Sequence, residues 1–308
     1  MINHYNTIVW SLLLTLFTFL ATAIQAQNNG IEDIYVRVKM NDGNTFFGKQ
    51  IALTDTHIII ETESLGKMNL PRENVKIFKV INKPTRSTSG QYWYENPNAT
   101  RNVFTPTGYS LRKGEGYYQN LMLFYNQVSY GFTDRFTIGL GVETISILNG
   151  FENDTGIGYS ITPKFSFPIQ EEKLNIGLGA LLINIPFRDD DQLLDLATLY
   201  GVTTFGTRDR NVSLGIGFGA IDGEFSGRPV VTISGNLRVS ERFALTTENW
   251  ILPNDDSVVI LSLGGRIIGN NVTWDISFIG ATDVDGGGEL GILPVPVVGL
   301  VAPFGGSW

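Results

Sequence analysis

Six charged residues in the last two thirds of the chain carry most of the chemistry that the interior of this protein could offer. Each lies on the less apolar face of a segment in which polar and apolar residues alternate. They are Glu143, Lys164, Arg238, Glu248, Arg266 and Asp275. Three are acidic and three are basic, so charge pairing that plugs a narrow interior is the favoured interpretation. The alternative is a pore lining, in which the same groups act on passing ions or solutes.

The remaining residues offer little for catalysis. Histidine occurs only at His4 and His57, and cysteine is absent, so a Ser-His-Asp or thiolate site cannot form beyond residue 57. Glu143, Glu248 or Asp275 could serve as a base, but pairing with neighbouring cations is the favoured role. We therefore predict a protein that is not an enzyme and has no catalytic residues and no cofactor. A lipid-modifying enzyme is kept as a third hypothesis.

Metal and nucleic-acid sites are not predicted either. The acidic, glycine-rich stretch 283–289 has carboxylates at a spacing that calcium could use, but it does not follow the EF-hand pattern. The net charge of −8 leaves no basic stripe to neutralise phosphates. We therefore expect neither a bound metal nor a nucleic-acid partner.

Three repeated segments indicate which elements position the six charges. They begin at Phe136, Leu174 and Val212, 38 residues apart each time, and in each one apolar residues alternate with glycine or a small polar residue. Glycine weakens a strand that merely faces water, so its presence needs another reason. The inside of a narrow barrel supplies that reason, because space is short there. The apolar face would then point outward into lipid.

Short polar turns tend to alternate with longer, more acidic connections along the rest of the chain, which is typical of outer-membrane barrels. Under that rule we count twelve strands, with ten as the alternative count. They span residues 103–112, 116–132, 136–148, 157–168, 174–186, 196–206, 212–221, 229–239, 243–253, 257–268, 272–282 and 290–304. The predicted fold is all-β, with an antiparallel up-and-down transmembrane β-barrel over residues 103–308.

Three parts precede the predicted barrel. Residues 1–26 contain a long apolar run that ends in alanines, as in a secretory signal peptide, with an uncleaved anchor helix as the alternative. Residues 27–83 contain five short predicted strands and one helical turn before the last, and this pattern resembles small SH3-like or Sm-like β-barrels. Residues 84–102 are predicted to be a linker, in which residues 91–101 could be an interfacial segment or a docked strand.

Aromatic residues near the predicted strand ends complete the pattern. Membrane-interface girdles need this placement, and the residues are Tyr130, Phe136, Phe243, Trp250 and Trp274. With Ala26-Gln27 and the hairpin 130–136, residues 102–308 resemble outer-membrane β-barrel proteins of Gram-negative bacteria, of the Bacteroidota type. The last strand in that family commonly ends in an aromatic residue. Here Trp308 lies four residues beyond Phe304, which departs from the pattern.

The resemblance implies a place in the outer membrane, with the N-terminal domain in the periplasm. We predict a structural or partner-binding role in the cell envelope. Outer-membrane lipid would surround the barrel, and residues 31–82 would dock another envelope protein. A narrow channel for ions or small solutes is the alternative function.

Overall fold

A computed structural model of the chain describes residues 34–62, 65–81, 85–86, 92–93, 95–144, 147, 157–170, 172–186, 193–252, 258–269, 271–283 and 294–305. The predicted signal peptide, residues 284–289 of the acidic stretch and Trp308 lie outside these ranges. Within these ranges, no helix is both long and apolar enough to span a membrane.

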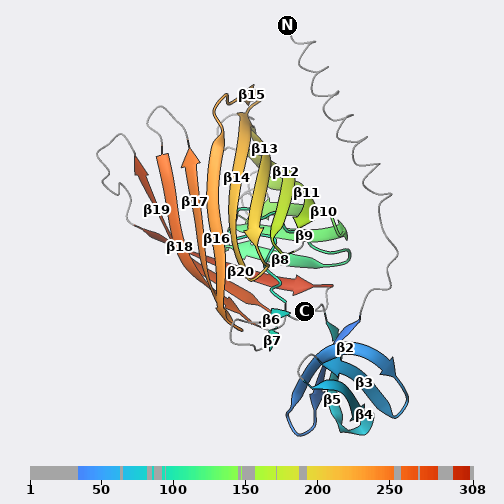
Figure 1. Ribbon diagram of the computed structural model, residues 1–308. Coiled ribbons are helices and arrows are strands. Elements are labelled where there is room, and N and C mark those ends of the chain that lie inside the picture. Colours follow the sequence, from blue (N-terminus) through green and yellow to red (C-terminus); the bar gives the residue numbers. More distant parts are fainter. Residues whose placement is uncertain are drawn as a thin grey trace.

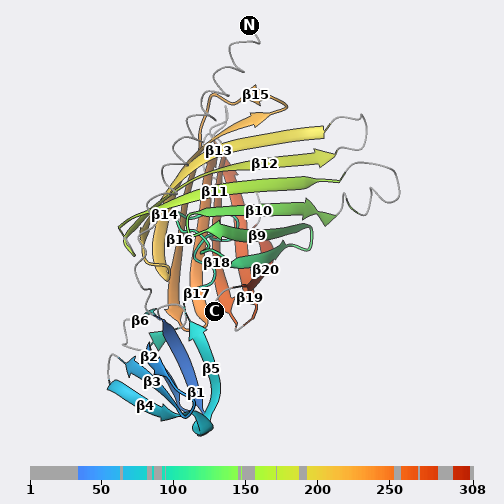
Figure 2. The ribbon, with the colours of Figure 1, turned by 90° about the vertical axis from the view of Figure 1, so that its right-hand side faces the viewer.

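Antiparallel strands form a closed barrel (Figures 1 and 2). The sheet has thirteen strands in the order β13-β12-β11-β10-β9-β8-β20-β19-β18-β17-β16-β14-β15, and it closes because β13 also pairs with β14. The two-residue β15 (Glu224–Phe225) only extends β14, which leaves twelve strands in the wall. These are β8 (Gly116–Leu121), β9 (Tyr125–Thr133), β10 (Phe136–Glu143), β11 (Tyr159–Gln170), β12 (Leu174–Pro186), β13 (Leu193–Gly206), β14 (Arg210–Ile221), β16 (Val230–Ser240), β17 (Phe243–Leu252), β18 (Val258–Ile268), β19 (Thr273–Asp283) and β20 (Val295–Phe304).

The predicted fold class and the count of twelve strands are confirmed, but the first two predicted strands are wrong. Residues 103–112 form no strand, and residues 116–132 contribute to two strands, β8 and β9. The turn between these strands holds Met122 and Leu123 at φ of 56° and 65°, which such side chains rarely adopt. Residues 121–124 are apolar throughout and therefore carry no turn signal. The two errors cancel in the count.

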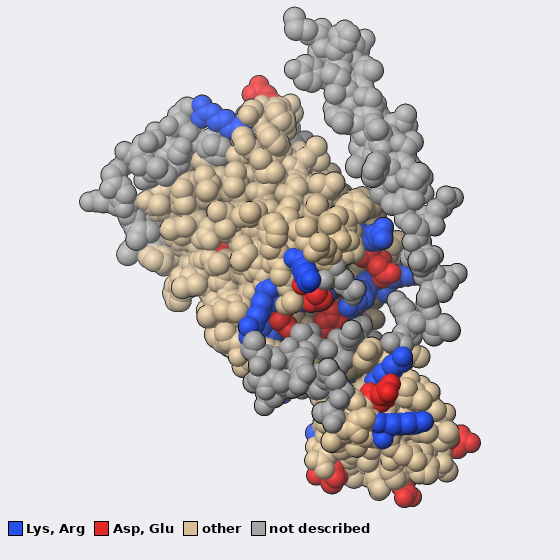
Figure 3. Space-filling view, viewed as in Figure 1, with Lys and Arg blue, Asp and Glu red and all other residues tan. Residues whose placement is uncertain are grey.

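The apolar faces of the strands point outward and the glycine faces point inward. In β10, Thr137, Gly139 and Gly141 are buried, whereas Leu140 is 59% exposed. On the face of the barrel in Figure 3, most of the surface is uncharged, and charged side chains gather mainly near the end that adjoins the N-terminal sheet. An uncharged, apolar barrel surface of this kind suits contact with hydrocarbon rather than with water.

A five-stranded antiparallel sheet precedes the barrel, in the order β4-β3-β2-β1-β5. Its strands are β1 (Tyr35–Met40), β2 (Thr45–Leu53), β3 (His57–Thr62), β4 (Gly66–Pro71) and β5 (Val75–Ile81). The predicted helical turn is the 3-10 helix η1 (Arg72–Asn74) before β5. Val36, Val38 and Ile60 are fully buried in the core of this sheet. The edge strands β4 and β5 do not pair within the described residues, so the sheet is open and the resemblance to SH3-like or Sm-like barrels stays a prediction.

The two ends of the barrel differ. Short turns join β9 to β10, β11 to β12, β13 to β14, β16 to β17 and β18 to β19 at one end, which we call the turn end, and the opposite end the loop end. The five-stranded sheet lies beyond the turn end (Figure 1). The two-residue strands β6 (Thr85–Arg86) and β7 (Tyr92–Trp93) pair with each other between this sheet and the barrel.

Most of the predicted girdle aromatics lie on the outer surface, but Trp250 does not. Tyr130, Phe243 and Trp274 are 38%, 37% and 45% exposed. The indole of Trp250 faces the lumen, where its Nε1 donates a hydrogen bond to Glu248 Oε1 at 3.2 Å. Two residues apart on one strand, Trp250 and Glu248 must share a face, so the girdle prediction for Trp250 is wrong.

Leu214→Arg tests the outward orientation, because Leu214 lies in the middle of β14 and is 47% exposed. We expect this substitution to lower the free energy of unfolding by about 2–4 kcal/mol, the cost of arginine near the midplane of a bilayer. Leu214→Phe is the matched control and should change it by less than about 1.5 kcal/mol. Guanidinium unfolding in lipid vesicles measures both, and an arginine variant as stable as the wild type would contradict the orientation.

Candidate functional site

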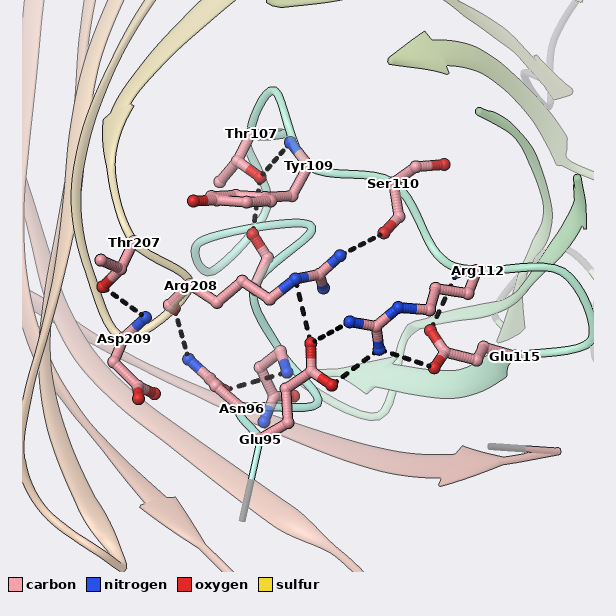
Figure 4. A network of polar contacts seen from close by, with 12 residues as sticks. Glu95, Asn96, Thr107, Tyr109, Ser110, Arg112, Glu115, Thr207, Arg208 and Asp209 are labelled. Carbon is pink, nitrogen blue, oxygen red and sulfur yellow. Dashed lines mark hydrogen bonds and ion pairs between the residues drawn. The ribbon is translucent and has the colours of Figure 1, made fainter. Parts of the chain in front are cut away.

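Residues 95–115 enter the lumen and occupy the part nearer the turn end (Figure 4). We call them the plug. They belong to no helix or strand apart from one isolated bridge between Arg101 and Pro106. Most are nevertheless buried, including residues 95–102 of the predicted linker. The plug is therefore the core of this half of the barrel.

The polarity of the plug explains why it is not a wall strand. As a strand, residues 103–112 would turn Thr105 and Thr107 to one side and Pro106 and Arg112 to the other. The face that carries Arg112 could not meet lipid, and Pro106 on the same face lacks the amide that a ladder needs. Inside the lumen many of these groups find partners, as the Thr107 hydroxyl and the Asn102 amide nitrogen do, and buried polar groups require partners.

Two strands and the plug meet at a cluster of three buried charges. Arg266 Nε lies 2.6 Å from Asp275 Oδ1, and Arg101 Nη1 lies 3.1 Å from Asp275 Oδ2. Arg266 also donates to the backbone oxygens of Asn98 and Asn102. The three charged side chains are at most 3% exposed. A single carboxylate is thus shared by one arginine of the wall and one of the plug.

Lys164 of β11 bonds to the plug backbone. Its ammonium donates to the carbonyl oxygens of Thr100, Thr107 and Tyr109 at 3.1, 3.1 and 2.6 Å. An ammonium has three donors, and here each has a carbonyl acceptor. The amide of Thr107 also donates to the oxygen of Thr100 at 3.0 Å. Lys164 therefore holds a fold of the plug in which these two residues lie opposite each other.

Glu248 of β17 plays the complementary part as an acceptor. Its Oε2 accepts hydrogen bonds from the amides of Phe104 and Thr105 at 2.8 and 2.9 Å, and from the Thr105 hydroxyl at 3.0 Å. Hydrogen bonds to a charged group are stronger than neutral ones. Glu248 thus holds the plug at Phe104 and Thr105, and Lys164 holds it where Thr100 and Thr107 lie opposite each other.

A second polar network anchors the plug at the turn end (Figure 4). Glu95 pairs with Arg112 at 2.6 Å and with Arg208 of the β13–β14 turn at 3.0 Å. Arg112 also reaches Glu115 at 3.4 Å. The Tyr109 hydroxyl donates to the backbone oxygen of Gly206 at 2.6 Å. The beginning and the end of the plug are therefore joined to each other and to one turn of the wall.

Arg238 and Glu143 lie apart from these plug contacts. Arg238 Nη1 lies 2.9 Å from Asp209 Oδ1, and its guanidinium lies over the Trp93 ring, 5.1 Å from the centroid. Burial raises the pKa of the Asp209 carboxyl, and Arg238 opposes that shift. Glu143 is half-buried at the loop end of β10, where its amide donates to the oxygen of Gly158. Of the six predicted lumen charges, four therefore meet the plug or its arginine: Lys164, Glu248, Arg266 and Asp275.

A cavity of about 500 Å³ occupies the lumen on the loop side of the plug. Phe104, Thr105 and Pro106 form part of its floor, and the exposed Ser226 and Arg228 border it toward the loop end. In the described part of the chain, no group of three or more histidine, aspartate and glutamate side chains could hold a metal ion. The plug can therefore close the lumen, and the cavity on its loop side can receive a molecule.

The prediction from sequence missed the charged residues of the plug and of the wall turn that contacts it. Arg101 and Arg112 lie in segments predicted to be linker and strand, and Arg208 and Asp209 lie in a turn predicted to be only a connection. One signal could have found the plug: residues 95–112 are rich in asparagine, threonine and arginine and hold two prolines. The arginines and prolines of such a segment argue against a strand of the wall.

Comparisons with known proteins give structural similarity only. No protein-family model and no curated protein matches the chain. Among solved structures, a KdgM porin in complex with disordered oligogalacturonate is 10% identical, with 62% of this chain and 99% of that chain covered at a TM-score of 0.45. A loop-deletion mutant of OmpT, an outer-membrane protein of Vibrio cholerae, is 11% identical, with 88% and 97% covered at 0.34. Pseudomonas aeruginosa OprD is 8% identical, with 88% and 93% covered at 0.34.

Asp275→Asn tests the shared carboxylate. Without the charge, Arg101 and Arg266 lose their common counter-ion inside the lumen, so we expect the free energy of unfolding to fall by about 3–5 kcal/mol. Glu224→Gln is the matched control at an exposed position of β15 and should change it by no more than about 0.5 kcal/mol. Equal effects of the two substitutions in a denaturant titration would show that the cluster does not hold the plug.

Proposed function

We propose that this protein is an outer-membrane channel for small solutes that is closed at rest by the plug. The supporting observation is that a polar chain segment, rather than wall side chains alone, fills the narrow part of the lumen. This ranks the channel ahead of the purely structural role that the sequence favoured. The proposal includes a Gram-negative host of the Bacteroidota type and an N-terminal sheet in the periplasm.

The chemistry of the plug contacts supports opening as well as closure. The plug meets the wall mainly through hydrogen bonds and ion pairs, as with Lys164, Glu248 and Asp275. Water can replace such partners when the plug moves, so the net cost of breaking each one is only about 0.5–3 kcal/mol. An apolar plug would lose far more on exposure to water.

The short connection between the N-terminal sheet and the plug suggests how the plug could be moved to open the channel. The five-stranded sheet ends at Ile81 and the plug begins at Glu95, so only 13 residues separate them. A partner that bound the sheet could therefore pull directly on the plug. Both edge strands of the sheet are unpaired within the described residues, and edges of this kind accept an added strand.

A structural or partner-binding role in the envelope is the second candidate. The observation that favours it is apolar exposure on the edge strand β5, where Phe78 and Val80 are 36% and 46% exposed. In that case the plug would be permanent and the sheet alone would act, by docking another envelope protein. A lipid-modifying enzyme ranks third.

Conductance of the purified protein in a planar bilayer tests the channel. Glu248→Gln keeps the shape of the side chain but removes the charge that three donors of the plug and the Trp250 indole share. If this weakens the plug by about 1.5–3 kcal/mol, brief openings should become roughly ten to a hundred times more frequent than in the wild type.

A disulfide tests whether the plug is the gate. Asn102 Nδ2 lies 2.7 Å from Ser234 Oγ of β16, and the chain has no cysteine of its own. In the Glu248→Gln background, Asn102→Cys with Ser234→Cys should abolish openings when oxidised and restore them on reduction. Each single cysteine variant is the control. Openings that persist when the pair is oxidised, or no openings in any variant, would count against the proposal.

A further inference from the structure

The alternation of polar and apolar residues stops near the loop end of strands β12 and β17, in a sector of five neighbouring strands. In β12, residues 180–183 read Ala-Leu-Leu-Ile, and β17 ends with Trp250, Ile251 and Leu252. Strands β12, β13, β14, β16 and β17 follow one another around the barrel. A continuous apolar run is typical of a strand that has apolar surroundings on both faces. The bilayer supplies such surroundings only on the outside.

The inward members of these runs come together on the wall of the cavity above the plug. They are Leu181, Ile183, Leu196, Ile221, Val230 and Leu252. Their neighbours on the same strands face outward, where Leu182, Leu199 and Ile251 are 41%, 69% and 37% exposed. This sector therefore carries large aliphatic side chains on both its lipid face and its lumen face, with Thr198 and Thr232 among those on the lumen face.

The turn half of the lumen shows what the same strands do when they face polar groups. There the inward positions hold Ser213, Ser234, Asn236 and Thr246, each at most 5% exposed. A wall that only faced water in the loop half would be expected to continue in this way. The change from hydroxyl and amide to aliphatic side chains instead marks a change in what the lumen receives.

Aromatic residues also surround part of the cavity, next to the plug. Phe104 of the plug lies against Trp250, with ring centroids 6.3 Å apart, and against Tyr125, at 6.1 Å. Tyr200 of β13 also lines the space. The cavity volume of about 500 Å³ falls within the range of roughly 300–1,000 Å³ that small-molecule sites occupy. Mostly apolar walls with some polar groups are typical of such sites, and here polar residues such as Gln119, Gln127 and Thr162 also line the cavity, on β8, β9 and β11.

We propose that this cavity binds a single long acyl chain. Each Å² of apolar surface that the chain removes from water contributes about 25 cal/mol, and the six aliphatic residues offer such a surface along one side of the lumen. The chain could come from a free fatty acid or from a monoacyl lipid, because both present the same methylene groups. This inference names the class of solute that reaches the plug. Its meaning for transport rests on the proposed channel function.

Quenching of tryptophan fluorescence tests the site. Trp10→Phe, Trp93→Phe, Trp274→Phe and Trp308→Phe leave Trp250 as the only indole of the full chain. Purified in amphipol, this variant is titrated with 9,10-dibromostearate and, separately, with a lysophosphatidylcholine that carries the same brominated chain. We expect saturable quenching by at least one probe. Saturation by the acid alone assigns a free fatty acid, and saturation by the lysolipid assigns a monoacyl lipid.

Two adjacent positions on β13 provide the matched pair. Thr198→Phe adds bulk on the cavity wall and should weaken binding by about tenfold or more. Leu199→Phe places the same phenyl ring on the lipid face and should leave binding within about twofold. Gly219→Leu is a second cavity-filling variant, because an added Cβ there meets no atom closer than 3.7 Å. Heat-modifiable migration on a gel confirms that each variant is folded.

Quenching that rises linearly without saturation and is equal in all variants would overturn the inference, because it would reflect partition around the barrel. Binding is measured here without any passage through the lumen. Saturable binding in a protein that never conducts would therefore keep the acyl site and remove the channel. Conductance without saturable binding would do the reverse.

Discussion

The structure depends on one constraint: the polar groups are inside the barrel, in the turn half of its lumen, and there they have to find partners in one another. A buried polar group without a partner costs free energy, and a buried charge without a counter-ion costs more. The plug meets this constraint with its backbone and with the side chain of Arg101. It offers carbonyls to Lys164, amides to Glu248 and a guanidinium to Asp275. The protein thus has a polar core inside an apolar shell, the reverse of a water-soluble domain.

The same constraint explains the glycine faces of the strands. A Cβ at Gly177 would lie 3.3 Å from the oxygen of Thr107 and 3.4 Å from Cα of Gly108 in the plug. Gly108 in turn approaches the backbone of Asn175 too closely for any side chain. Plug and wall therefore touch backbone to backbone at this point. Elsewhere the inward glycines make room for wall side chains, as Gly179 does for Tyr200.

Much of this arrangement could be predicted from the sequence. Where apolar residues recur at every second position, the sequence shows directly which face of the strand is apolar. The outward direction of Leu140 and Leu214 and the lumen placement of Lys164 and Glu248 follow from that period alone. The plug could not be found in this way, since it has no period and some of its main partners lie far away in the chain, as Lys164 does from Thr100. The turn at Met122 and Leu123 escaped because apolar residues adopt left-handed conformations there.

The position of the plug is the central claim, and amide hydrogen exchange of the folded protein in detergent tests it most directly. The amides of Phe104, Thr105 and Gly108 donate to Glu248 and Thr204 of the wall. We expect the peptide that covers residues 100–111 to exchange slowly, on the timescale of the neighbouring strands β12 and β17. Exchange of that peptide at the rate of an unstructured chain, while the strands stay protected, would contradict the account.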